Sequence, residues 1–87
     1  MFELGRVVIT RTAHAFCESK GVDALDFLQR HVLGDWGDLC SQDKDANRNA
    51  VKLGGRILSA YHVHGEKLYV ITEADRSYTT ILMATDY

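Results

Sequence analysis

The feature that most constrains the fold is a change in the spacing of apolar residues at Gly54 and Gly55. Before this pair, apolar residues recur at helical spacing, as in Ala46, Ala50 and Leu53. After it, residues 57–63 alternate between two faces, as in a β-strand. Proline is absent from the chain, so glycines and capping residues must supply the breaks between elements. The sequence therefore predicts a helical part followed by a β part.

The remaining elements are predicted from local composition. A β-branched run at 6–10 predicts a first strand, and further strands are predicted at 57–63, 67–72 and 78–83, with a turn at 64–66. Three helices are expected to begin at Thr12, Asp23 and Ser41 and to end at Gly21, Gly34 and Gly54. The order βαααβββ predicts an α+β fold in which three short helices pack on one face of a small antiparallel sheet. The 87 residues are expected to form a single domain.

Composition narrows the function classes. The chain is 46% hydrophobic and 25% charged, with a net charge of −2. A general nucleic-acid binder carries a basic face and usually a positive charge, so no direct nucleic-acid binding is expected. Six aspartates between positions 23 and 45 indicate either a solvated acidic face or a docking face for a basic partner: Asp23, Asp26, Asp35, Asp38, Asp43 and Asp45. Because a domain of this size buries a modest surface, pairing into a homodimer is also a reasonable expectation.

Two cysteines, no signal-like N-terminus and no long apolar run predict a reduced, cytoplasmic protein without membrane contact. Four residues at suitable local spacing could supply zinc ligands: His14 with Cys17, and His62 with His64. No Cys-x-x-Cys or His-Glu-x-x-His pattern accompanies them. No metal and no cofactor is therefore predicted.

Two polar loops are the candidate functional segments. The first is residues 34–38 (GDWGD), in which Trp36 either packs over the edge of the core or serves as an exposed interface anchor. The second is residues 73–77 (EADRS), which is either a hairpin turn stabilised by Asp75 or a recognition loop. The predicted partner-binding residues are Asp35, Trp36, Asp38, Glu73, Asp75 and Arg76.

An enzymatic alternative uses histidine and arginine. In a small RNA-cleaving enzyme or toxin, His62 or His64 would move protons while Arg56 and Arg76 hold phosphate. The acidic balance of the chain argues against an RNA substrate. No nucleophile motif such as Gly-x-Ser-x-Gly is present, and no catalytic residue is predicted.

Several motifs together resemble one family of small bacterial proteins borne on plasmids, integrative elements and prophages. These proteins carry labels such as "plasmid-related protein" or "type I restriction endonuclease subunit M". The resemblance covers nearly the whole chain and rests on RH at 30–31, GDWGDL at 34–39, GGRILSAY at 54–61, VITEADRS at 70–77 and TTIL at 79–82. The chain departs from the family's pattern at 12–14 and 46–47, which puts any role of the third helix in doubt.

The resemblance implies a passenger of a mobile element rather than a methyltransferase subunit, which needs a cofactor-binding domain several times longer. Small acidic passengers of this kind frequently inhibit host defence by binding a nuclease or its guide-bound complex. The resemblance thus implies a protein-binding inhibitor of the anti-CRISPR or anti-restriction type, by analogy of context alone.

Overall fold

The computed structural model describes residues 2–87 and confirms the predicted α+β class and the order of elements. Its helices and strands are β1 (Arg6–Ile9), α1 (Arg11–Lys20), α2 (Ala24–Val32), α3 (Ser41–Leu53), β2 (Ile57–Val63), β3 (Glu66–Thr72) and β4 (Tyr78–Met83), followed by a short 3₁₀ helix, η1 (Ala84–Asp86).

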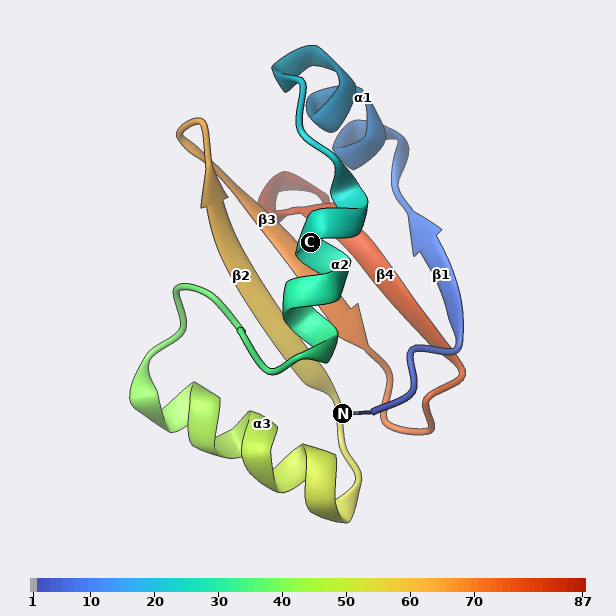
Figure 1. Ribbon diagram of the computed structural model, residues 1–87, viewed down its shortest axis with the longest axis vertical. Helices are drawn as coiled ribbons and strands as arrows, with labels where there is room; N and C mark the ends of the chain where they lie inside the picture. Colours follow the sequence, from blue (N-terminus) through green and yellow to red (C-terminus); the bar gives the residue numbers. More distant parts are fainter. Residues whose placement is uncertain (1) are drawn as a thin grey trace.

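The four strands form one mixed sheet in the order β1-β4-β3-β2 (Figure 1). The pairs β2–β3 and β3–β4 are antiparallel hairpins, whereas β1 runs parallel to β4. The prediction of a wholly antiparallel sheet is therefore wrong at this one edge. Three helices and two strands separate β1 from β4 in the chain, so no tight turn forces the two strands to run in opposite directions.

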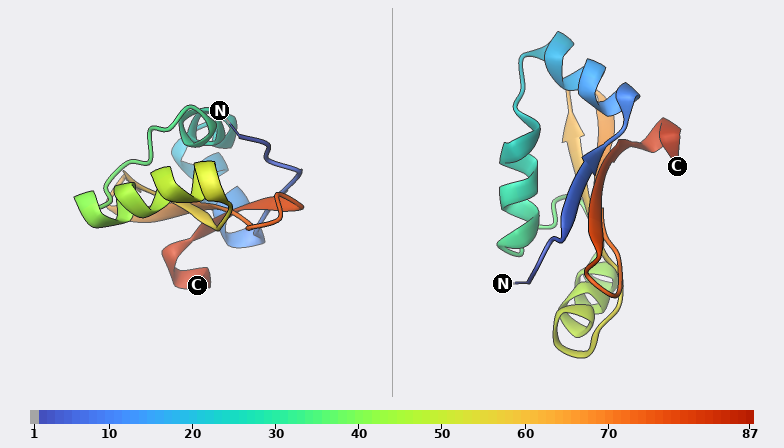
Figure 2. Two further views of the ribbon diagram at one scale, coloured as in Figure 1. Left: turned by 90° about the horizontal axis from the view of Figure 1, so that it is seen from below. Right: turned by 90° about the vertical axis from the view of Figure 1, so that its right-hand side faces the viewer.

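The helices occupy different positions around the sheet. Helix α2 lies along one face, while α1 and α3 lie toward opposite ends of the sheet (Figure 1). The C-terminal η1 lies on the other side of the sheet from α2 (Figure 2). The main core fills the space between α2, α1 and the sheet, and its buried residues are Ala13, Cys17, Leu28, Tyr61, Val63, Leu68, Val70, Ile81 and Met83.

Two predicted helix starts differ from those observed. Thr10, not Thr12, caps α1, because its extended backbone lets Oγ1 accept a hydrogen bond from the N–H of Ala13 at 3.1 Å. Cys40, not Ser41, occupies the N-cap position of α3 and makes no side-chain capping bond. Asp23 caps α2 as predicted, accepting from the N–H of Leu25 at 3.0 Å.

Candidate functional site

The loop at 34–38 is fastened to the outer edge of β2. The N–H of Ala60 donates to the carbonyl of Trp36 at 3.1 Å, and the N–H of Asp38 donates to the carbonyl of Ala60 at 2.7 Å. Gly37 bridges to Ala60 in parallel orientation with φ of 75°, and a Cβ at Gly37 would lie 2.1 Å from the Ala60 oxygen. Only glycine fits this approach. The segment 36–38 therefore covers the backbone edge of β2.

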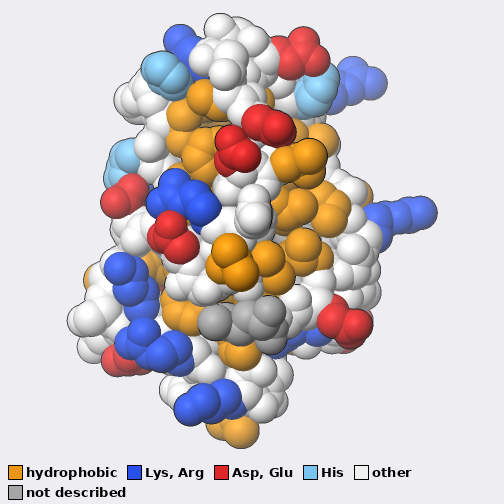
Figure 3. All heavy atoms as spheres, in the orientation of Figure 1, with side chains coloured by type: hydrophobic (Ala, Val, Ile, Leu, Met, Phe, Trp, Pro, Cys, Tyr) orange, Lys and Arg blue, Asp and Glu red, His pale blue; other side chains and the backbone are white. Residues whose placement is uncertain are grey.

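Two carboxylates project from this covered edge. Asp35 accepts a hydrogen bond from Nε of Arg30 at 2.7 Å, and one Asp38 oxygen accepts from both the N–H and Nδ1 of His62, at 3.1 and 2.7 Å. The hydrogen bond from Arg30 lowers the pKa of Asp35, and the side-chain hydrogen bond from His62 lowers the pKa of Asp38. The two side chains are 55% and 54% exposed. Both carboxylates are thus ionised, oriented and open to solvent. Acidic and basic side chains are interspersed on the face of the molecule that Figure 3 shows.

Trp36 itself points inward. Its side chain is 5% exposed and packs in a second buried cluster with Ala50 and Ile57, against Phe2 and Val51. Its indole Nε1 has no hydrogen-bond partner among residues 2–87. The interpretation of Trp36 as an exposed anchor is therefore wrong, because the backbone pairing with β2 directs the indole under α3.

The loop at 73–77 is organised by Arg76, which is half-buried and has a positive φ of 61°. Its Nη1 donates to the carbonyls of Gly55, Glu73 and Ala74 at 2.7, 3.1 and 3.1 Å. Its Nη2 donates to the carbonyl of Ala50 in the last turn of α3 at 2.9 Å. The Ala50 carbonyl also accepts a hydrogen bond from the N–H of Gly54 at 2.9 Å, so Arg76 is its second donor. A cation at a helix C-terminus is favourable. Arg76 therefore holds the β3–β4 loop against α3, and both of its terminal nitrogens donate to carbonyls of the chain.

The two acidic residues of this loop have local partners as well. Asp75 accepts a hydrogen bond from the N–H of Ser77 at 2.9 Å, and its bonds to Ser77 lower its pKa. Glu73 lies 3.7 Å from Nε of Arg56. Both residues line a shallow surface pocket of about 400 Å³ together with Ala74, Ser77 and Tyr78. These contacts are those of a stabilised hairpin turn.

The two loops meet the same part of α3 from different directions. The Trp36 side chain packs in one cluster with Ala50, and Arg76 binds the Ala50 carbonyl. Their shared contact is internal, because Trp36 is buried and the guanidinium is engaged. Of the six predicted partner-binding residues, Asp35, Asp38 and Asp75 are exposed. Asp75 bonds only within its own turn, whereas Asp35 and Asp38 are oriented by Arg30 of α2 and His62 of β2.

The four residues of the RNA-cleaving alternative do not converge. Arg56 and His62 are six positions apart on one extended segment, which separates them by about 20 Å. Arg76 is engaged with backbone carbonyls, and His62 is paired with Asp38. His64 lies in the β2–β3 turn with a φ of 47°. The geometry brings His62 and Asp38 together, but neither arginine reaches them.

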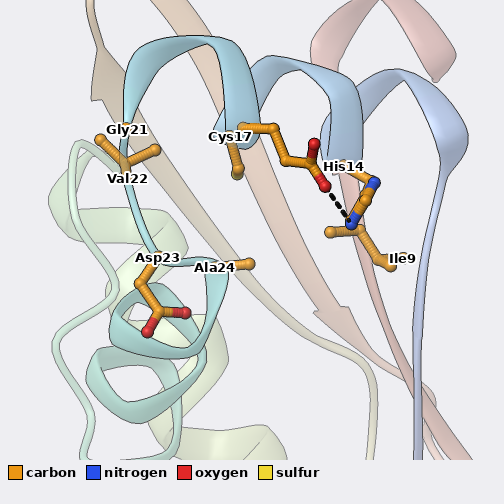
Figure 4. Close-up of a pocket in the computed structure, with 8 residues that line it drawn as sticks. Ile9, His14, Cys17, Gly21, Val22, Asp23 and Ala24 are labelled. Atoms are coloured by element: carbon orange, nitrogen blue, oxygen red, sulfur yellow. Dashed lines mark ion pairs between the residues drawn. The ribbon is translucent and has the colours of Figure 1, made fainter.

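The predicted zinc ligands also have other environments. His14 lies 3.1 Å from Glu18, and both line an open pocket of about 390 Å³ between α1 and the start of α2 (Figure 4). Cys17 lines the same pocket, and burial raises the pKa of its thiol. Within residues 2–87, no three His, Cys, Asp or Glu side chains group as metal ligands.

A buried polar network was missed at the sequence level. Nδ1 of His31 shares a hydrogen bond of 2.6 Å with Oγ of Ser59, and Nε2 shares one of 2.9 Å with Oγ1 of Thr72. Thr72 bonds Thr79 at 2.8 Å, and Thr79 donates to the carbonyl of Leu4 at 2.7 Å. His31 has no exposed surface, and burial lowers its pKa to about 4. The network is sealed from solvent, so it joins α2 to three elements rather than meeting a substrate. The signal was present, because Ser59, Thr72 and Thr79 fall on the apolar face of their strands.

Comparison of the chain with protein-family models found no match, and neither the curated proteins nor the solved structures gave one. None of the described helices has the length and apolar character needed to span a bilayer.

Proposed function

We propose that this protein is a protein-binding inhibitor of a host nuclease or defence complex, carried by a mobile element and acting in the cytoplasm. The observation that carries the proposal is the fixed pair of ionised carboxylates, Asp35 and Asp38, on the covered edge of β2. Nuclease complexes hold nucleic acid in basic channels, and ionised carboxylates held in fixed positions complement basic groups of such a channel. The partner is thus a protein, and no cofactor is required for occupancy.

The rigidity of the segment supports the proposal. Asp35 and Asp38 flank a stretch that is hydrogen-bonded to β2 on both sides of Gly37. Their carboxylates are oriented before any partner arrives, so binding does not have to order them. Each carboxylate also retains free lone pairs, because a carboxylate offers about four acceptor positions.

The test is inhibition of purified defence nucleases of several types by the purified protein. The wild type is expected to bind at least one of them and to reduce its cleavage of nucleic acid. The double variant Asp35→Asn/Asp38→Asn is expected to lose about tenfold or more in binding, since removing charges from a complementary interface weakens association. The matched control is Asp43→Asn/Asp45→Asn, which removes the same charge from α3.

Two outcomes would contradict the proposal. Absence of binding to all of these complexes at micromolar protein would refute the inhibitor function. Equal loss in both double variants would refute the assigned surface and leave only a general charge effect. Growth arrest on expression that His62→Gln relieves would instead support the RNA-cleaving alternative.

A further inference from the structure

Among residues 2–87, no strand pairs with the outer side of β1 at the opposite edge of the sheet. Strand β1 contacts β4 on one side, and no other element lies over its outer side in the right-hand view of Figure 2. Its apolar residues Val7, Val8 and Ile9 are 42%, 37% and 37% exposed. Exposed edge strands are usually blunted by proline, lysine or a bulge. Strand β1 has no proline and no lysine, and its one charged residue is Arg6 at its first position. The apolar stretch at 7–9 is therefore the part of the edge that can pair with another strand.

The free backbone groups of β1 are identified by its pairing with β4. The N–H groups of Arg6 and Thr10 donate to the carbonyls of Ser77 and Ile81, at 3.1 and 3.0 Å. Successive residues of a strand direct their backbone groups to opposite sides, so Val8 also faces β4. Val7 and Ile9 therefore direct their N–H and C=O groups away from the sheet.

We propose that two copies of this chain pair through β1 in an antiparallel, two-fold symmetric arrangement centred on Val8. In this register Val7 of each copy faces Ile9 of the other, so their outward groups exchange four hydrogen bonds. The two Val8 side chains meet at the symmetry axis as a non-hydrogen-bonded pair, in which side chains lie closest. The result is one continuous sheet of eight strands.

Charge complementarity favours a second copy as the occupant. The register places Arg6 opposite Thr10 of the other copy, and Thr10 donates through Oγ1 to Asp86 at 2.7 Å. Arg6 and Thr10 share the face of β1 on which η1 lies, so each guanidinium reaches the Asp86 carboxylate of its partner. Within residues 2–87, Arg6 has no acidic partner in its own chain. In the proposed dimer, Arg6 of each copy gains the Asp86 carboxylate of the other copy as its acidic partner.

The affinity expected for the dimer follows from the area that the two β1 strands can bury. Each copy contributes a four-residue strand, which is less than the roughly 800 Å² per partner of a standard stable interface. The dimer is therefore weak and forms in a concentration-dependent manner. The measurement is sedimentation equilibrium of the full chain from about 10 µM to about 1 mM, a range suited to interfaces below the standard size.

The first variant places two like charges at the symmetry axis. Val8→Lys is expected to weaken dimerisation by about tenfold or more, because like charges directly opposite one another on paired strands are destabilising. The matched control is Leu53→Lys, which adds a lysine at an apolar residue that is 85% exposed at the end of α3. Circular dichroism and the unfolding midpoint establish that each variant is folded.

The second test asks whether Arg6 of one copy lies against Asp86 of the other, as the proposed register requires. Arg6→Asp and Asp86→Arg each place like charges opposite one another and are expected to be monomeric alone. Mixed in equal amounts, they restore both opposite-charge contacts, so the mixture is expected to dimerise as the wild type does. A wild-type protein that stays monomeric up to about 1 mM would overturn the proposal. The same holds if β1 binds a strand of another protein but not a second copy of this chain. A dimer that survives Val8→Lys, or a mixture no tighter than either variant, would do so too.

Discussion

The two edges of the sheet differ in whether another segment of the chain hydrogen-bonds to the edge strand. At β2, the chain folds back so that residues 36–38 take up backbone groups of Ala60, and Gly37 makes this approach sterically feasible. At β1, the outward groups of Val7 and Ile9 have no backbone partner among residues 2–87. The covered edge presents carboxylates, whereas the free edge presents a strand. The comparison teaches that one small sheet can carry two surfaces of different chemistry, one suited to basic groups and one suited to strand addition.

A substitution at Gly37 is expected to disrupt the pairing of residues 36–38 with β2 more than any other change. Gly37→Ala is expected to lower the free energy of unfolding by about 3 kcal/mol or more, because the added Cβ meets the Ala60 oxygen and the conformation is strained. Urea denaturation measures the change. Gly21→Ala is the control, since Gly21 has a similar φ of 66° but nothing within 4 Å of its added Cβ, and about 1 kcal/mol is expected. Equal losses would show that steric closure of the edge is not what requires glycine.

The free energy of unfolding is expected to respond to His31 in the core and to Asp38 at the covered edge in different pH ranges. His31 has a pKa of about 4 in the fold against an ordinary 6.5, so the unfolded chain takes up its proton first. Stability is therefore expected to fall by about 3 kcal/mol as the pH drops from 6.5 to 4. Asp38 has a lowered pKa, so its contribution is lost only at more acidic pH, below its ordinary 3.8.

The measurement is the unfolding free energy as a function of pH. His31→Gln is expected to remove the slope between pH 6.5 and 4, and Asp38→Asn is expected to leave that slope in place. A slope that persists in His31→Gln would assign the acid lability to another group.

The free edge depends on Arg76. The loop that Arg76 organises receives the N–H of Arg6, through the Ser77 carbonyl at 3.1 Å, and packs closely on Gly5. Arg76→Ala is expected to cost about 2 kcal/mol, because hydrogen bonds from a charged donor to four carbonyls are lost. Arg56→Ala removes only an exposed pair and is expected to cost about 0.5 kcal/mol or less. A chemical-denaturation series that ranks the two variants equally would contradict this role.

The smallest effect concerns the exposed carboxylate of Asp38. Asp38→Asn weakens its hydrogen bonds to His62 without changing the shape of the side chain. Amide hydrogen exchange at Asp38 and His62 is expected to quicken by about two- to tenfold, since local opening becomes easier. Asp75→Asn is the control and is expected to affect the Ser77 amide instead. Unchanged exchange at the covered edge would show that backbone pairing alone holds the segment.

Much of the fold could be predicted because local patterns and tertiary packing agree. The alternation at 57–63 places Ile57, Tyr61 and Val63 on one face of the strand, and all three are buried. The parallel pairing of β1 could not be predicted, because a four-residue β-branched run fits either direction equally well. The start of α1 was misplaced for a similar reason, since Thr10 and Thr12 are both capable caps.

The candidate site was harder to predict because its residues act over long chain separations. The sequence indicated that Asp35, Trp36 and Asp38 belong together, yet the direction of each side chain depends on Ala60, which is more than twenty residues away. Arg76 likewise binds a backbone carbonyl of α3. Every residue has such a carbonyl, so the sequence does not show which one a side chain will bind.

The burial of Trp36 has a practical consequence, because it is the only tryptophan in the chain. An indole shielded from water fluoresces at shorter wavelength than one in solvent, so the emission spectrum reports directly on whether the segment beside β2 stays docked. No label has to be introduced, and titration of a ligand onto Asp35 and Asp38 can be followed optically from the residue between them.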